Sequence, residues 1–167
     1  RSGRDYEQCL RGTLYADCSQ GASILRTQFK AIQTCNTILE GLKNSSVDRS
    51  YIKEIEGEIR FLRALNYYYA VRMFGDVPLY KERITDVASA SIKRTSFKEV
   101  YAFIEQDLEF AFANMRDKAR QQELTGLSGR ADKYAAKAFL ADLYLQIGSL
   151  LYSPDDQAFG TIETGYV

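Results

Sequence analysis

The stretch from Arg49 to Phe74 constrains the fold of this chain more than any other part of its sequence. Its first half is apolar on one side only, with isoleucine and leucine at helical spacing. Its second half, from Phe61 onward, is apolar almost all round. A helix that is apolar on every side has to be enclosed by other elements. We therefore predict a central helix over residues 49–74, with Asp48 as its N-cap and Gly75 after its last turn.

Three more segments have helical periodicity, at about 22–42, 96–115 and 131–147. The segment 96–115 starts at a capping box, in which Glu99 follows Ser96 by three positions. Residues 76–95 and 116–129 are expected to be loops, and Gly148 is expected to end the last helix. Before the first helix we expect a loop that includes a short helix from Asp5 to Leu14. No segment of useful length alternates between apolar and polar residues as a strand does. Residues 1–167 are therefore predicted to be one all-α unit of two antiparallel helix pairs.

The last predicted helix also contains half of a tetratricopeptide (TPR) pattern, Leu140-Ala141-x-x-Tyr144-x-x-x-Gly148. In that pattern the small residue admits a partner helix, the tyrosine fills the groove and the glycine ends the helix. The central helix keeps only the alanine and glycine positions. The helix pairs are therefore interpreted as TPR-like, and an ordinary helical bundle is the alternative.

Composition excludes several classes of function. Lys plus Arg and Asp plus Glu both number 22, so the chain has no overall charge to attract nucleic acid or an anionic membrane surface. It has no histidine, which removes His-dependent nucleophile systems, a His-ligated zinc and the commonest general base. No Gly-rich phosphate loop and no apolar run of membrane-spanning length occurs. We predict no cofactor, no metal site and no catalytic residues.

The acidic residues step by two along the helices, as in Glu54/Glu56/Glu58 and Glu105/Asp107/Glu109. Such side chains splay around a helix axis, so we interpret both sets as solvated surface. Of the three cysteines, Cys35 lies on an apolar helical stripe and is read as a buried small hydrophobe. Cys9 and Cys18 can bridge only in an oxidising compartment, which composition leaves open.

Four blocks, in order along residues 29–148, resemble the SusD/RagB family of outer-membrane nutrient-binding proteins. Residues 58–79, EIRFLRALNYYYAVRMFGDVPL, resemble the family's most recognisable helix and its F-G-D-V-P-L ending. Residues 29–39 resemble the preceding helix, although Phe29 replaces the usual tyrosine. Residues 100–111 fit V-Y-x-x-I-x-x-D-L-x-x-A, and residues 129–145 resemble the family's G-R-A-x-K block, with Leu127-Ser128 where a Pro or Thr often stands.

The polar residues inside these blocks have structural explanations. Arg60 and Arg63 lie next to aromatic residues and are expected to pair with acids or cap carbonyls. Asn36 is expected to bridge helices through its amide. Asp107 is expected to accept hydrogen bonds from an Arg or Lys of a neighbouring helix, although it belongs to one of the acidic sets.

The resemblance implies a lipid-anchored protein on the outer face of the outer membrane. Family members bind oligosaccharides, or peptides in some branches, and work with a TonB-dependent, SusC-like transporter. They run to several hundred residues, so this chain would be an N-terminal portion, and no lipid-attachment motif is visible in it. The resemblance implies a binding protein and not an enzyme.

Sugar binding needs flat aromatic faces and polar groups for hydroxyls. The local candidates are Tyr15, Asp17 and Gln20, in the predicted loop before the first helix. An exposed aromatic cluster there favours ligand capture, whereas a concave apolar groove on the helix pairs favours a TPR-like interaction module without a small ligand. A hydrolase, the third option, needs converging carboxylates with raised pKa values.

Overall fold

The computed structural model describes residues 19–46, 48–126 and 129–151. Within these ranges the regular elements are helices: α2 (Ser19–Lys43), α3 (Arg49–Phe74), α4 (Val87–Ala90), α5 (Phe97–Asn114), α6 (Lys118–Thr125) and α7 (Lys133–Leu151). The described part contains no strand; a single antiparallel bridge joins Val77 to Thr95. The prediction of an all-α fold is confirmed.

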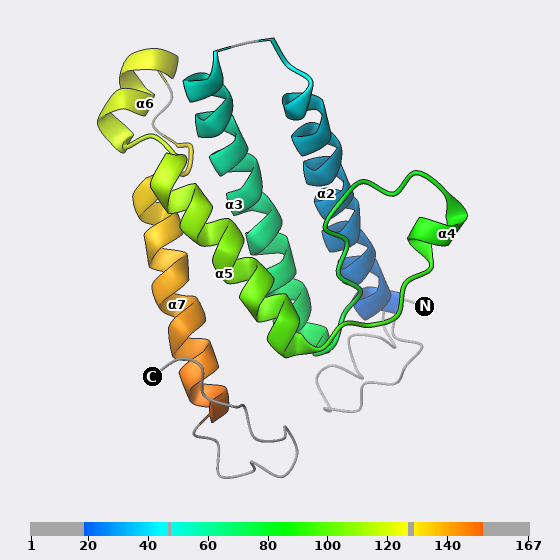
Figure 1. Ribbon diagram of the computed structural model, residues 1–167. Helices are drawn as coiled ribbons and strands as arrows, with labels where there is room; N and C mark the ends of the chain where they lie inside the picture. The colour runs from blue at the N-terminus through cyan, green and yellow to red at the C-terminus, as the bar shows by residue number, and fades with distance from the viewer. Residues whose placement is uncertain (1–18, 47, 127–128, 152–167) are drawn as a thin grey trace.

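The four long helices form two antiparallel pairs, as predicted (Figure 1). α3 lies between α2 and α5, and α7 packs against α5. Residues 75–96 connect the pairs by passing back across α2 before α5 begins (Figure 1). The central position of α3 follows from its apolar second half, which the neighbouring helices enclose.

The predicted ends of α3 and α5 are confirmed by capping contacts. The Asp48 carboxylate accepts hydrogen bonds from the backbone N–H groups of Ser50 (2.7 Å) and Tyr51 (3.4 Å). Gly75 follows α3 with a φ of 65°, in the left-handed region that suits glycine. The Ser96 hydroxyl accepts from the Glu99 N–H at 3.4 Å, as a capping box requires.

Three predictions about these segments are wrong. Residues 76–95 are not all loop, because the four-residue helix α4 forms there. Residues 116–129 are not all loop, because α6 forms there with Asp117 as its N-cap and Gly126 (φ 65°) after its last turn. α6 is polar on all sides, so hydrophobic periodicity does not reveal it. α7 does not stop at Gly148 but continues to Leu151. A helical glycine costs only about 1 kcal/mol, and the contacts of Ile147 and Leu150 with the core offset that cost.

The core lies where α3, α5 and α7 meet. Its fully buried side chains come from all three helices and from Ile32 of α2. Edge-to-face aromatic contacts join them, including Phe61 with Phe139 at 5.7 Å and Tyr67 with Phe103 at 5.6 Å between ring centroids. Gly57 allows α3 to approach the end of α5 closely: a Cβ added there would lie 3.0 Å from Met115 Cγ and 3.2 Å from its backbone nitrogen.

We expect Gly57→Val to lower the free energy of unfolding by about 1–3 kcal/mol, because the added methyl groups would push α5 away from α3. Gly41→Ala is the matched control, since nothing lies within 4 Å of a Cβ at that helical glycine. It should raise stability by roughly 0.5–1 kcal/mol through reduced backbone entropy. Urea unfolding followed by circular dichroism measures both, and equal midpoints for Gly57→Val and the wild type would contradict the prediction.

Candidate functional site

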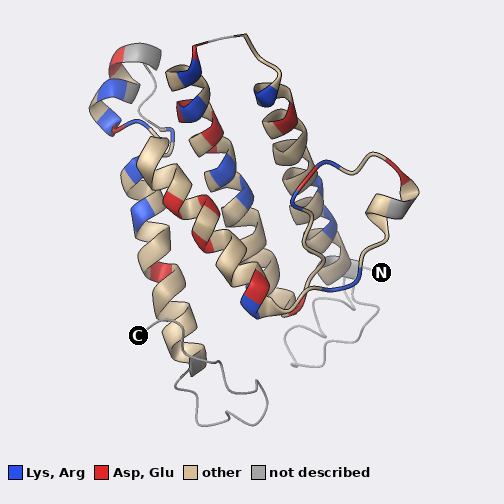
Figure 2. Cartoon of the chain, in the orientation of Figure 1, with Lys and Arg blue, Asp and Glu red and all other residues tan. Residues whose placement is uncertain are grey.

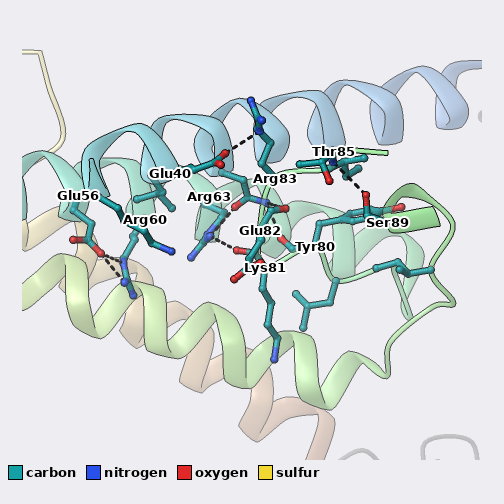
Figure 3. A pocket seen from close by; sticks show the side chains of 16 residues that line it. Glu40, Glu56, Arg60, Arg63, Tyr80, Lys81, Glu82, Arg83, Thr85 and Ser89 are labelled. Carbon is teal, nitrogen blue, oxygen red and sulfur yellow. Dashed lines mark hydrogen bonds and ion pairs between the residues drawn. The ribbon is translucent and has the colours of Figure 1, made fainter. Parts of the chain in front are cut away.

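A cavity of about 790 Å³ opens between α2, α3 and the connection that follows α3 (Figure 3). Charged and polar side chains supply most of its lining, with a few aliphatic residues between them. The residues that matter below are Asn36, Glu40 and Lys43 of α2, Glu56, Arg60 and Arg63 of α3, and residues 79–85 of the connection.

Arg63 forms the floor of the cavity and is buried, with a side chain 6% exposed. Its Nε and Nη2 donate to the two carboxylate oxygens of Asp107 at 2.7 and 2.8 Å. Its Nη1 donates to Asn36 Oδ1 at 2.7 Å and to the Lys81 carbonyl at 3.1 Å. Four of the five guanidinium donors are therefore used inside the protein, so Arg63 is a structural residue and not a free ligand-binding cation.

Asn36 completes this network from α2. Its Nδ2 donates to the carbonyls of Tyr80 and Glu82, both at 2.9 Å. On the other side, the Tyr67 hydroxyl accepts from the Tyr80 N–H at 2.7 Å and lies 3.1 Å from the Tyr80 carbonyl. The backbone of residues 80–82 is thus held against α2 and α3. The predicted roles of Asn36, Arg63 and Asp107 are confirmed.

The buried network shifts the pKa values of its acids and phenols. Burial raises the pKa of Asp107 above the ordinary carboxyl value, and the Arg63 guanidinium opposes the shift. Burial is also the main reason why the pKa of Tyr67 is raised. The pKa of Tyr68 rises to about 12, through burial and through its hydrogen bond to Asp142. All three groups have protein hydrogen-bond partners, so we expect them to act through packing and hydrogen bonds.

The rim of the cavity consists largely of ion pairs. Arg60 contacts Glu56 at 2.6 Å, and Arg83 contacts Glu40 at 2.8 Å (Figure 3). Lys43 and Lys81 also line the cavity, and each has an exposed side chain. Because most donors of Arg63 are used internally, the rim groups are the main contacts that this cavity offers a polar ligand. No group of acids or cysteines in the described ranges is arranged to hold a metal ion.

The reading of the acidic residues on α3 as solvated surface is wrong. Glu54 pairs with Arg116 at 2.7 Å and with Arg120 at 3.2 Å, and its side chain is only 16% exposed. Glu58 pairs with Arg130, from the segment before α7. These partners follow α5 in sequence and are brought beside α3 only by the fold, so spacing along α3 does not reveal them. Asp107, from the second acidic set, is 1% exposed, whereas Glu109 is exposed as predicted.

The proposed sugar-binding residues remain a prediction. Tyr15 and Asp17 lie outside the described residues. Gln20 belongs to the first turn of α2, so it is helical and not in a loop, and its side chain is not described. The cavity itself was not predicted, because residues 80–85 show no pattern that would place them over α2. The one sequence feature that could have indicated this cavity is the polar Asn36 on an otherwise apolar helix face.

The comparisons with known proteins decide the family. A family model described as SusD-like, starch-binding and associating with the outer membrane matches residues 14–145. The chain belongs to the SusD-like family.

Its SusD-like relatives are much longer than the chain. SusD-like protein P2 of Formosa agariphila is 29% identical over 149 residues, which are 89% of this chain but 27% of that protein. The starch-binding protein SusD of Bacteroides thetaiotaomicron is 40% identical over 91 residues, 54% of this chain and 15% of that protein. A SusD-like carbohydrate-binding protein of Bacteroides fragilis has a TM-score of 0.75 at 29% identity, covering 83% of this chain and 26% of that structure.

These matches agree with the architecture. They also show that this SusD-like chain spans about a quarter of SusD-like protein P2 and of the Bacteroides fragilis structure. No helix in the part of the chain that the structure describes is long and apolar enough to cross a membrane.

We expect Asp107→Leu to cost about 3–5 kcal/mol of stability, because it leaves the buried Arg63 guanidinium without a counter-charge. Glu40→Gln is the control, since its partner Arg83 is 46% exposed and a surface pair contributes at most about 1 kcal/mol. Arg63→Met combined with Asp107→Leu should recover much of the loss. Thermal unfolding measures the stability of all three variants. If Asp107→Leu and Glu40→Gln lose similar amounts of stability, the buried pair of Arg63 and Asp107 does not dominate.

Removing the Asn36 amide should release the connection after α3. Asn36→Ala deletes two hydrogen bonds to residues 80–82, worth about 1 kcal/mol each, so tryptic cleavage after Lys81 and Arg83 should become roughly thirtyfold faster. Thr37→Ala is the matched control, because that hydroxyl bonds only to its own helix, at the Gln33 carbonyl. Equal cleavage rates in the two variants would show that other contacts hold the segment.

Proposed function

We propose that the whole protein to which this chain belongs is a glycan-binding protein of the outer-membrane surface. The observation that carries the proposal is the SusD-like family match over residues 14–145, a family described as starch-binding. The relatives named above include a starch-binding and a carbohydrate-binding protein. The protein is lipid-anchored and passes its ligand to a TonB-dependent, SusC-like transporter; oligosaccharides are the expected ligands and peptides a secondary class.

In this proposal the described helices act mainly as a scaffold. The aromatic rings near the cavity face inward: Tyr67 is fully buried, and the Tyr80 ring packs edge-to-face on Phe29 at 5.8 Å between centroids. Neither offers the flat exposed face on which a sugar ring stacks. The first ligand contacts within the chain are therefore assigned to Tyr15, Asp17 and Gln20, next to the start of α2.

The alternative, a TPR-like interaction module without a small ligand, would be favoured by a concave apolar groove. Most residues that line the cavity of the described part are instead charged or polar, although their aliphatic stems and a few aliphatic residues supply apolar surface between the charges. A hydrolase would need carboxylates that converge, whereas Glu40 and Glu56 at this cavity each pair with an arginine. Binding is the function that this geometry supports best, and the protein is proposed not to be an enzyme.

The test is calorimetric titration of a panel of oligosaccharides and peptides into the whole-length protein and into the 167-residue chain. We expect the whole-length protein to bind a glycan, and Tyr15→Ala to weaken that binding roughly tenfold through loss of a stacking face. Tyr51→Ala, at an exposed tyrosine at the start of α3, is the control. Binding unaffected by Tyr15→Ala would move the site elsewhere; no binding by the whole-length protein would favour the interaction module.

A further inference from the structure

Two polar stripes, one on α2 and one on α3, line the cavity between these helices. The stripes consist of residues four and three positions apart: Asn36, Glu40 and Lys43 on α2, and Glu56, Arg60 and Arg63 on α3. This spacing keeps each stripe on one side of its helix. Asn36 bonds to Arg63 at one end of the cavity, and Lys43 lies roughly 10 Å further along α2, at 1.5 Å per residue. The cavity is therefore bordered by charges along its length.

The carboxylates that line the cavity are mostly neutralised by arginines. Arg60 holds Glu56 Oε1 through both Nε (2.8 Å) and Nη2 (2.6 Å). Arg83 holds Glu40 at 2.8 Å, and Figure 3 shows both pairs. Among the described residues, Glu82 is the one lining carboxylate that forms no ion pair. The acids of this cavity thus leave one negative charge uncompensated.

The cations of the cavity are less fully used. Lys43 and Lys81 line it, are exposed and form no ion pair with a described carboxylate. Arg60 also keeps donors to spare, because its Nη1 lies 3.6 Å from Asp107 Oδ1, which is too far for a hydrogen bond. The Arg60 side chain is 30% exposed, so a ligand can reach Nη1. The groups free to meet a ligand therefore carry an excess of positive charge.

We propose that this cavity is a subsite for an acidic sugar, whose carboxylate or sulfate binds Lys43, Lys81 and Nη1 of Arg60. The inference rests on the proposed function and names the class of glycan. The volume of about 790 Å³ falls in the range of roughly 300–1,000 Å³ that ligand pockets occupy. Charge-assisted hydrogen bonds are about twice as strong as neutral ones, so they make up for the missing stacking face. The helices remain a scaffold, and side chains at the rim contact the ligand.

Other occupants fit the cavity less well. A neutral sugar would rely on stacking, but the ring of Tyr80, the aromatic residue that lines the cavity, packs on Phe29. An acidic peptide carries the same charge, but its backbone N–H groups need acceptors. The free groups of the cavity are mainly donors, and sugar hydroxyls can accept from donors as well as donate.

The first test is calorimetric titration of the whole-length protein with matched pairs of oligosaccharides. Oligogalacturonate and oligomannuronate are each compared with their methyl esters, and a sulfated galactan oligosaccharide with its desulfated form, so the pairs distinguish carboxylate from sulfate. The acidic member of at least one pair should bind about tenfold more tightly or better, and this preference should shrink as NaCl rises from about 0.1 M to about 1 M.

The failures of the two proposals are distinguishable in this experiment. Equal affinities within every pair, or binding of neutral glycans alone, would overturn the acidic subsite and leave the proposed function standing. A whole-length protein that binds no glycan, neutral or acidic, would overturn the proposed function and the subsite together.

The second test locates the contact. Lys43→Gln combined with Lys81→Gln should weaken binding of the acidic glycan roughly tenfold and leave binding of its neutral counterpart unchanged. Lys118→Gln, at an exposed lysine of α6 that does not line the cavity, is the control. Wild-type affinity of the double variant for the acidic glycan would overturn the proposal. A triglutamate peptide that binds more tightly than every acidic glycan, and loses affinity in the double variant, would overturn it in favour of a peptide.

Discussion

Arg63 and Asp107 meet where α2, α3, α5 and the connection after α3 come together. Removing two charges from water is costly, and their attraction offsets that cost only when the geometry is good and the remaining polar groups are satisfied. Both conditions hold: the guanidinium donates twice to the carboxylate, and Asn36 and the Lys81 carbonyl accept from its outer nitrogen. We interpret the network as the device that sets the register of α2, α3 and α5, since sliding any one of them would leave a buried charge unpaired.

The two halves of α3 are held by different forces, and the fold depends on both. The first half joins α5 and the segments around α6 through ion pairs from Glu54 and Glu58, together with the close approach at Gly57. The second half is enclosed by aromatic and aliphatic side chains of α5 and α7. The buried ion pair between Arg63 and Asp107 lies at the boundary between the two halves of α3. The apolar half supplies most of the burial energy, and the ion pairs orient the segments at the other end.

This division explains why the described helices suit a scaffold better than a ligand site. The buried polar groups of Arg63, Asp107 and Asn36 already have protein partners, and the cavity between α2 and α3 is bordered by arginines that are paired with glutamates. A binding protein needs such a rigid support, because ligand-contacting segments lose less entropy on binding when their anchor does not move.

Local signals were enough to predict several features of the protein. The caps at Asp48, Ser96 and Gly75 fixed three helix ends, and the apolar second half of α3 placed that helix at the centre. Asn36 and Asp107 were predicted to contact neighbouring helices, although the acidic set that contains Asp107 was interpreted as solvated surface. These predictions succeed because capping and amphipathicity depend on residues a few positions apart.

The tertiary structure decided the rest. It paired Glu54 with Arg116, laid residues 80–82 across Asn36, and carried α7 through Gly148 to the core contact of Leu150. In each case the deciding partner is distant in sequence or the local preference is weak, so contacts made only in the folded chain outweigh it. The sequence by itself therefore determined the four long helices, their order and the family, whereas the ion pairs and the cavity follow only from how those helices pack.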